Sequence, residues 1–491
     1  MEAEYVLGVD LGTSSCKVAV VGIDGVVAAT GRAEYPTSTP HDGWAEQPPS
    51  SWFDAVVFAV RAALTTGAVS GSDVKAISLT SAAHIAVLIG ANGREIRDAI
   101  LWNDARSASD AAELEKKHGE YIRKVTYNAV TPTWSLSHLA WIRRTEPDTW
   151  GETERICFSK DYVAFRLTGA FVTDPGTATA SMLFDAESGR WSDTICSWLD
   201  LDPRNLPRIE AARTVIGTVQ KDAADALGIK EGTPVVNGTL DSATETYAVG
   251  ANSPGSAVIR LGTAGGIHVV SAEPFSDRRL ITYPHPNQPL WYAQAGTMAA
   301  GSAIEWALEA LGGGRRLSHA ELISLAETAP VGADGVLFRP HLSGERCPYW
   351  DTSLRGGFTG LSTRHGAAHL ARSVIEGVAF SLADAFSIFE SQGVVLDSVS
   401  VVGGGCHNGV LLQTVSDLFN RTLVIAEHAD SSLGAAYLAI DALAGTTGAW
   451  DADDPSQTER RTVAPIGENG RILTEMLAEY VSVISAARSR D

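Results

Sequence analysis

The stretch that decides the fold is Tyr5-Val6-Leu7-Gly8-Val9-Asp10-Leu11-Gly12-Thr13-Ser14. Its apolar first half predicts a buried strand that ends at a carboxylate, Asp10. A Gly-Thr-Ser turn follows and leads into two further predicted strands, 17–23 and 26–31, joined at Asp24-Gly25. A carboxylate beside a turn of this kind is suited to hold phosphates and a magnesium ion, so the stretch predicts nucleotide binding.

Length and charge limit the class of protein. The chain has 491 residues, more than one hydrophobic core usually supports, so two domains are expected. Strand and helix patterns alternate along it, which indicates an α/β fold. The formal net charge is −20, from 38 Lys and Arg against 58 Asp and Glu. This charge argues against nucleic acid or a membrane surface as partner, and leaves ATP to be bound by local backbone amides and a metal ion.

The cysteines and the N-terminal residues predict a cytoplasmic protein. Five scattered cysteines form no C-x-x-C pair and are typical of buried thiols in a reducing compartment: Cys16, Cys157, Cys196, Cys347 and Cys406. The acidic N-terminal residues Glu2 and Glu4 do not fit the basic region of a signal peptide. No apolar run reaches the length that spans a membrane.

A second glycine-rich turn lies far downstream, at Gly262-Thr263-Ala264-Gly265-Gly266, between predicted strands 257–261 and 267–271. It repeats the pattern around Thr13, either by coincidence or because the chain contains an internal duplication. The duplication predicts two related domains that face each other across a cleft. A loop cluster near residues 247–254 places the boundary between domains 1–247 and 248–491.

Two further strand ends carry candidate site residues. Asp241 follows an apolar strand and precedes a predicted helix, 243–248, so it is either a general base for a substrate hydroxyl or a helix N-cap. Gly403-Gly404-Gly405 follows the predicted strand 398–402 and precedes Asn408 and a helix. This run either brings the backbone close to a flat ligand such as adenine or is a tight turn.

Candidate sugar-recognition residues lie in the first half. Trp102-Asn103-Asp104 offers an aromatic wall, an amide and a carboxylate for hydroxyl groups, or else a core Trp with a capping Asp. His84 could donate to a substrate hydroxyl, or it is a core histidine. The pair His365 and His369 has metal-ligand spacing but no third ligand, so we interpret it as a helix start and a surface face.

These blocks, in this order, resemble the FGGY carbohydrate kinases of the actin and hexokinase superfamily, most closely the xylulokinase branch. The family's second signature begins at Gly356-Gly357-Phe358-Thr359-Gly360-Leu361 and ends at His369-Leu370-Ala371-Arg372-Ser373-Val374-Ile375-Glu376. The resemblance covers about residues 5–445, and includes Gly43-Trp44-Ala45-Glu46-Gln47, Lys160-Asp161-Tyr162, Leu342-Ser343-Gly344-Glu345-Arg346 and Leu433-Gly434-Ala435-Ala436. It implies two ribonuclease H-like domains flanking an ATP and sugar cleft.

The resemblance also implies roles for individual residues. Asp241 would be the general base, and Asp10 would act near Mg²⁺ through water or phosphate. The nucleotide ATP would be held by Gly12, Thr13, Ser14, Gly262, Thr263, Gly301, Gly404, Gly405 and Asn408. The sugar pocket would be shaped by Ala83, His84, Trp102, Asn103 and Asp104, together with Asp241. A monomer and a homodimer both stay open, although members of the family often form dimers.

Departures from the family pattern affect the expected substrate. Ala83 and Ile85 flank His84 where xylulokinases commonly have Met and Gly, which replaces one bulky pocket wall and adds another. His138 stands where a lysine is usual, and Ser242 follows Asp241 where Asn is common. The resemblance favours transfer of phosphate from ATP to D-xylulose, giving D-xylulose 5-phosphate. Alternatives are D-ribulose, L-xylulose, erythrulose or gluconate as substrate, an actin-like ATPase switch, and a sugar-binding regulator that has lost catalysis.

Overall fold

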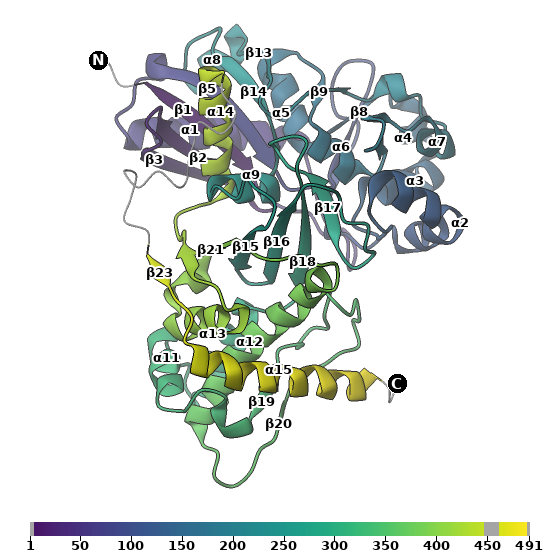
Figure 1. Cartoon of the computed structure of the whole chain (residues 1–491). Coiled ribbons are helices and arrows are strands. Elements are labelled where there is room, and N and C mark those ends of the chain that lie inside the picture. The colour runs from purple at the N-terminus through teal and green to yellow at the C-terminus, as the bar shows by residue number, and fades with distance from the viewer. Residues whose placement is uncertain (1–3, 446–460, 489–491) are drawn as a thin grey trace.

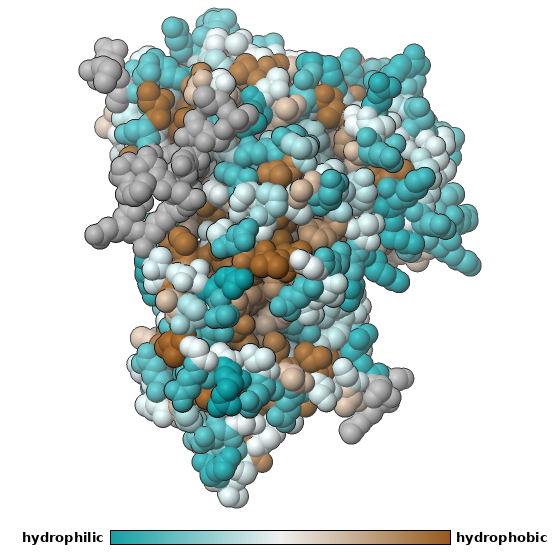
Figure 2. Space-filling view, viewed as in Figure 1, coloured by the Kyte–Doolittle hydropathy of each residue, from teal (hydrophilic) through white to brown (hydrophobic). Residues whose placement is uncertain are grey.

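The computed structural model describes residues 4–445 and 461–488. Figure 1 shows two lobes, each built around a β-sheet with helices against it. On the face seen in Figure 2, hydrophobic residues gather between the lobes, whereas the lobes themselves are largely hydrophilic. The α/β class and the two-domain arrangement predicted from the sequence are confirmed.

The first lobe contains a six-stranded sheet built from β1 (Tyr5–Leu11), β2 (Ser15–Gly22), β3 (Val27–Glu34), β5 (Val74–Ser81), β13 (Val215–Thr218) and β14 (Pro234–Leu240). The strand order is β13-β14-β5-β1-β2-β3. β1, β2 and β3 are antiparallel, β5 and β14 continue parallel to β1, and β13 closes the edge antiparallel to β14. The three strands predicted from the opening stretch are therefore confirmed.

The second lobe repeats this topology. Its sheet is built from β15 (Ser256–Leu261), β16 (Gly265–Ser271), β17 (Ile281–Pro284), β18 (Trp291–Thr297), β21 (Ser398–Val402), β22 (Leu423–Ile425) and β23 (Thr462–Val463). β18, β16 and β15 are antiparallel, β21 and β22 run parallel to β15, and β23 is antiparallel to β22. The order β18-β16-β15-β21-β22-β23 matches β3-β2-β1-β5-β14-β13 of the first lobe, and β17 is an additional strand at the edge. The match supports a duplication over coincidence.

Both faces of the central strands are buried, so their side chains alternate between two cores. In β1, Leu7 and Val9 face one cluster, whereas Val6 faces another. In β15, Ile259 lies in the core of its own lobe, and Val258 lies in a cluster shared with Leu240 of the first lobe. Strands buried on both sides read as continuous apolar runs, which is why these segments are recognisable from sequence.

Helices cover the sheets and connect the strands. They are α1 (Pro49–Thr66), α2 (Ala108–Thr126), α3 (Ser135–Thr145), α4 (Pro147–Glu152), α5 (Ser159–Thr168), α6 (Pro175–Ser181), α7 (Asp193–Trp198), α8 (Lys221–Leu227), α9 (Asp241–Ala248), α10 (Gly301–Ala310), α11 (His319–Glu327), α12 (Ala367–Glu390), α13 (Gly409–Phe419), α14 (Ser431–Ala444) and α15 (Gly467–Arg488). The predicted C-terminal helix is confirmed as α15, which buries Leu473, Met476, Tyr480 and Ile484.

Short elements complete the chain. Two-stranded pairs are formed by β4 (Glu46–Gln47) with β7 (Ala99–Ile100), β6 (Ala86–Ile89) with β8 (Arg155–Phe158), β9 (Val172–Thr173) with β12 (Arg208–Ile209), β10 (Phe184–Asp185) with β11 (Arg190–Trp191), and β19 (Leu337–Arg339) with β20 (Gly357–Thr359). Within the described residues, the helices are too short or too polar to cross a membrane. All five cysteines are free and buried.

Helix α14 comes late in the chain but packs on the first sheet, against β1 and β5, and against α9 (Figure 1). Two glycines allow this close approach. A Cβ at Gly8 would lie 1.9 Å from the carbonyl oxygen of Ser432, and a Cβ at Gly434 would lie 1.9 Å from that of Thr244. The domain boundary at residue 247 stays a prediction. Helix α14 follows that boundary in the sequence but packs on the sheet of the first lobe.

Candidate active site

The turn at Gly12 to Ser14, predicted to bind phosphate and called here the first phosphate turn, connects β1 to β2 and is held in place from several sides. The Gly12 N–H donates to the Ser15 carbonyl at 3.1 Å, and the Tyr35 hydroxyl donates to the Gly12 carbonyl. Thr13 accepts two side-chain donors, Gln47 Nε2 on its carbonyl at 2.8 Å and Trp102 Nε1 on its hydroxyl at 2.9 Å. The turn is therefore preorganised and joined to the predicted sugar-pocket wall.

Three other carboxylates, Asp241, Asp430 and Glu245, lie close enough to Asp10 to act on its charge. Burial raises the pKa of Asp10 well above its usual value, and the nearby Asp241, Asp430 and Glu245 raise it further. Burial also raises the pKa of Glu245 to about 7, although Arg260 lies 3.6 Å away and opposes the shift. Two buried acids, Asp10 and Glu245, with two partly buried ones close enough to raise the pKa of Asp10, favour the arrival of a cation.

Asp241 is the first residue of α9, but it is not the helix cap. The N-cap position is occupied by Leu240. The Asp241 Oδ1 atom accepts the N–H of Ser242 at 2.7 Å, and burial raises the pKa of Asp241 above its usual value. Asp241 is therefore not the N-cap of α9, which was the alternative to a catalytic role. The general-base role stays a prediction.

Ser242 anchors Asp241 to the second lobe. The Tyr292 and Ser242 hydroxyls lie 2.9 Å apart, and the Gln294 side-chain amide donates to the Ser242 hydroxyl at 2.7 Å. Both partners belong to β18. Ser242, which replaces the residue common in the family, therefore forms hydrogen bonds with both Tyr292 and Gln294.

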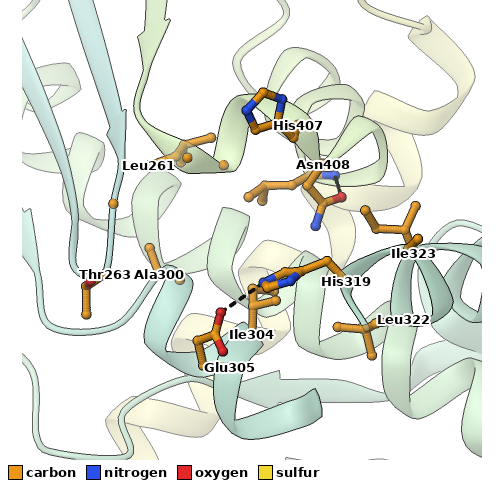
Figure 3. A pocket seen from close by; sticks show the side chains of 16 residues that line it. Leu261, Thr263, Ala300, Ile304, Glu305, His319, Leu322, Ile323, His407 and Asn408 are labelled. Carbon is orange, nitrogen blue, oxygen red and sulfur yellow. Dashed lines mark hydrogen bonds and ion pairs between the residues drawn. The ribbon is translucent and has the colours of Figure 1, made fainter. Parts of the chain in front are cut away.

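A cavity of about 800 Å³ lies in the second lobe (Figure 3). It brings together six of the predicted nucleotide-binding residues: Gly262, Thr263, Gly301, Gly404, Gly405 and Asn408. Apolar side chains contribute another wall, from Leu261, Ile304, Leu322, Ile323 and Leu411. The mixture of glycine backbone and aliphatic side chains suits a flat, partly apolar ligand such as a nucleoside.

Polar groups at this cavity come partly from residues that the sequence analysis missed. His319 Nε2 and Glu305 Oε1 lie 2.9 Å apart, as the dashed line in Figure 3 shows. His407 also lines the cavity. Asn408 caps α13, because its Oδ1 accepts the Leu411 N–H at 3.0 Å. His319 and Glu305 lie on different helices and form no local motif, so no sequence signal marked them.

A second cavity, of about 340 Å³, opens between the lobes. Trp102 contributes to it from the first lobe, and Gln294, His268 and Arg346 from the second. Gly262 and Thr263 line this cavity as well as the nucleoside cavity. The turn at Gly262 and Thr263, predicted to bind phosphate and called here the second phosphate turn, therefore lies where the two cavities meet.

His84 lies in a constrained position. Its backbone is left-handed, with φ of 67°, which is uncommon for a residue with a side chain. Nδ1 lies 2.9 Å from the Ala180 carbonyl, and because a carbonyl only accepts, Nδ1 carries the proton. Nε2 then accepts the Tyr283 hydroxyl at 2.9 Å, and burial lowers the pKa of His84 to about 4. Neutral His84 presents an acceptor at Nε2, not the donor expected from the sequence.

Of the residues predicted to shape the sugar pocket, Trp102 lines the second cavity, whereas Ala83, His84, Asn103, Asp104 and Asp241 do not. The Asp104 carboxylate is buried, and accepts the Ala45 N–H at 2.6 Å and the Arg106 guanidinium at 2.7 Å. Arg106 also pairs with Glu46 and lies 3.6 Å above the Trp44 ring. Asn103 is exposed in the turn that follows Trp102. The structure therefore uses Asp104 to hold this loop.

The departures around His84 are not equivalent. Ala83 is partly exposed, whereas Ile85 is 4% exposed and lies in the core of the first lobe. The expectation that Ile85 adds a pocket wall is not met, because its side chain packs away from solvent. His138 is also buried, and burial lowers its pKa to about 4.

The carboxylates fit a magnesium ion held jointly with phosphates. Asp10 Oδ1 and Glu245 Oε1 are buried and have no hydrogen-bond partner among the residues described. Among the described residues, no group of three or more His, Cys, Asp or Glu side chains could hold a metal ion by itself. The pair His365 and His369 therefore has no third ligand there. Mg²⁺ usually takes only one or two carboxylates, with phosphates and water completing its shell.

Comparisons with known proteins agree with this geometry. Models of the FGGY family of carbohydrate kinases match the chain, the N-terminal domain at residues 5–247 and the C-terminal domain at 257–443. The xylulose kinase of Bacillus subtilis (strain 168) is 30% identical over 439 residues, which cover 89% of this chain and 88% of that protein.

Solved structures show the same architecture over the full length. The xylulose kinase of Rhodospirillum rubrum is 29% identical, with a TM-score of 0.91 over 99% of each chain. The gluconate kinase of Lactobacillus acidophilus is 25% identical, with a TM-score of 0.91 over 99% of this chain and 98% of that one.

The duplicated two-lobe α/β fold with its glycine-lined cavity is that of a sugar phosphotransferase. More specifically, the chain belongs to the FGGY family of carbohydrate kinases. It is a sugar kinase that uses ATP.

Proposed function

We propose that this kinase transfers the γ-phosphoryl group of ATP to a hydroxyl of a small ketose or polyol, and that D-xylulose is the substrate, giving D-xylulose 5-phosphate. The observation that carries the proposal is Asp241, a partly buried carboxylate that starts α9 without capping it and whose pKa is raised. The xylulose kinases among the relatives support the choice of sugar.

In the proposed reaction, Asp241 takes the proton of the sugar hydroxyl as its oxygen attacks. The bond between the γ-phosphorus and the bridging oxygen breaks, the new bond to the sugar oxygen forms, and ADP keeps the bonding electrons. Backbone N–H groups of the turns at Gly12 to Ser14 and at Gly262 and Thr263 hold the phosphates. Mg²⁺, when bound near Asp10, neutralises charge on the phosphate oxygens.

The sugar would bind beside Trp102, with Ala83 and His84 at the same end of the first lobe. Trp102 offers an apolar face. The Nε2 atom of neutral His84 is a hydrogen-bond acceptor, which the Tyr283 hydroxyl occupies in this structure and which a sugar hydroxyl would take over. Because His84 is neutral, it brings no charge that would favour an anionic substrate.

Gluconate is the second candidate substrate. The gluconokinase of Bacillus subtilis (strain 168) is 27% identical over 97% of this chain, and the gluconate kinase structure named above has the same fold. A carboxylate-bearing sugar would need a cation in its pocket, and Arg346 and Arg260 line the second cavity. D-Ribulose, L-xylulose and erythrulose share the ketose chemistry of D-xylulose.

The experiment is ADP release from Mg²⁺-ATP with each of these sugars and with a no-sugar blank. D-Xylulose is expected to give the highest kcat/KM. Preference for gluconate would overturn the sugar assignment, and turnover equal to the blank with every sugar would overturn sugar transfer.

Asp241→Asn tests the chemical step. Turnover should fall by about 10³-fold or more, because the amide takes no proton, whereas ATP binding should stay within about twofold. Asp193→Asn is the matched control, since Asp193 also starts a helix but is exposed. In the wild type, kcat should decrease as the pH falls through the raised pKa of Asp241. Near-normal turnover of Asp241→Asn would refute the base assignment.

We also propose a cytoplasmic location, and the two assemblies to be distinguished are a monomer and a homodimer. The buried free thiols of the chain support this location. Cell fractionation tests the location, and light scattering of the purified chain tests the assembly, with a mass of about 104 kDa expected for two chains of 51.8 kDa.

A further inference from the structure

Arg346 carries a charge that the described residues leave unpaired. Its Nε atom is buried and has no hydrogen-bond partner there, and Nη2 donates only weakly to the Thr297 carbonyl, at 3.3 Å. None of the ion pairs found in the described residues includes Arg346. Burial lowers its pKa from the usual value.

The adjacent Glu345 carboxylate opposes the lowering of the Arg346 pKa and accepts the Arg346 backbone N–H at 2.8 Å, but it forms no ion pair with the guanidinium among the described residues. Glu345 is buried, and its oxygens accept the Met298 N–H at 2.6 Å, the His341 ring at 3.0 Å and the Ser381 hydroxyl at 3.2 Å. Other arginines at the second cavity are paired, Arg279 with Asp277 at 2.6 Å and Arg260 with Glu245 at 3.6 Å. Arg346 differs from both.

A partly buried guanidinium whose Nε is shielded from water and has no anion beside it costs free energy, so its retention calls for an anionic ligand. The cavity has room for one beside the guanidinium. Its floor is glycine backbone at Gly265, Gly266 and Gly296, and the Arg346 guanidinium carbon would lie 3.4 Å from a Cβ at Gly296. The guanidinium therefore lies close over a strand surface that has no side chain.

The position of the second phosphate turn indicates which anion binds beside Arg346. Gly262 and Thr263 line both the nucleoside cavity and the cavity of Arg346. A nucleotide seated in the first cavity with its phosphates on this turn would direct its terminal phosphate toward the second. The anion that reaches Arg346 is then a phosphoryl group.

We propose that Arg346 binds the phosphoryl group during its transfer and holds the phosphate of the sugar product. The proposal rests on the proposed kinase function of the cleft. Arg346 forms no covalent bond and moves no proton. The N–H groups of its guanidinium donate to the oxygens of the transferred phosphoryl group and offset their negative charge. A sugar carboxylate and a purely structural contact with Thr297 are the competing explanations.

The test compares wild type, Arg346→Gln, Arg346→Lys and the control Arg355→Gln. Arg355 is exposed and donates only to backbone carbonyls of Thr352 and Leu354, so its loss removes the same charge away from the cavity. We expect kcat to fall by about 10²–10³-fold in Arg346→Gln, with partial recovery in Arg346→Lys and the KM for ATP nearly unchanged. Arg355→Gln should keep wild-type kinetics.

Calorimetry separates phosphate from sugar. Arg346→Gln should bind D-xylulose 5-phosphate at least tenfold more weakly than wild type and bind D-xylulose equally well. Equal loss for both ligands, or no loss for either, would overturn the proposal. If Arg346→Gln does not fold, as judged by circular dichroism, the same comparison is made with Arg346→Lys.

A wrong sugar assignment can be told apart from a wrong role for Arg346. If wild type binds neither D-xylulose nor its phosphate, the assigned sugar has failed. Inorganic phosphate added to the Mg²⁺-ADP complex then tests Arg346 alone. Binding to wild type and Arg355→Gln but not to Arg346→Gln supports the proposal, and equal or absent binding in all three refutes it.

Discussion

The indole N–H of Trp102 donates to the Thr13 hydroxyl at 2.9 Å, which joins the proposed sugar-pocket wall to the first phosphate turn. Trp102→Phe keeps an aromatic face and removes this hydrogen bond. We expect kcat to fall about tenfold, because the phosphate turn loses a support, and stability to fall by about 1 kcal/mol. Steady-state kinetics and urea unfolding measure the two effects.

The control for this prediction is Trp198→Phe. Trp198 lies on α7, which in Figure 1 is far from β1 and β2, the strands that the turn at Thr13 connects, and it stacks on His118 with ring centroids 3.8 Å apart. This variant should keep the wild-type kcat. An unchanged kcat in Trp102→Phe would show that the turn does not depend on Trp102.

Sequence patterns predicted the parts of the fold that depend on local order. The strand run from Tyr5 and the glycine turns at Thr13 and Thr263 are local features, and the structure has strands and hairpins at these positions. The motif order also predicted the family. The glycines predicted to bind the nucleotide stand out in the sequence because close backbone approach restricts the residue type, and several of them line one cavity.

Tertiary contacts account for what the sequence did not predict. Asp104 satisfies a pattern for hydroxyl recognition, but the choice between a ligand and Arg106 depends on side-chain direction. Helix α14 packs on the first sheet through Gly8, more than 400 residues earlier, and no local period records that contact. Arg346 was recognisable as part of a family block, but its missing partner became visible only in three dimensions.

Glu245→Gln is expected to change the pH dependence of stability. The pKa of Glu245 is raised to about 7 in the folded protein, so the native state binds more protons than the unfolded state between the usual glutamate value and pH 7. Wild type therefore loses stability as the pH rises through this window. At pH 8 the variant should be more stable by on the order of 1–3 kcal/mol, and at pH 4 the two should agree.

Urea unfolding at pH 4, 6 and 8 checks this sign. Glu479→Gln on the exposed face of α15 is the control, and it should differ from wild type by less than about 0.5 kcal/mol at each pH. A Glu245→Gln variant that is less stable than wild type at pH 8 would show that the Arg260 pair outweighs the burial of the carboxylate.

Gly434→Ala tests the contact between α14 and α9. The new Cβ would lie 1.9 Å from the Thr244 carbonyl oxygen, so one helix must shift. We expect a loss of about 3 kcal/mol or more in unfolding free energy, and a lower kcat because Thr244 is one turn from Asp241. Gly467→Ala is the control, since nothing lies within 4 Å of its added Cβ. Similar melting temperatures for the two variants would contradict the close packing.

Ala83→Met and Ile85→Val separate the two departures that flank His84. Ala83 is partly exposed near the sugar end of the first lobe, so a methionine there should change the ratio of kcat/KM between D-xylulose and the other sugars by about tenfold. Ile85 is buried in the core, so valine should lower stability by about 0.5–1.5 kcal/mol and leave that ratio unchanged. A ratio that shifts with Ile85→Val, or stays constant with Ala83→Met, would mean that substrate choice is transmitted through the core beneath His84, not through the surface beside it.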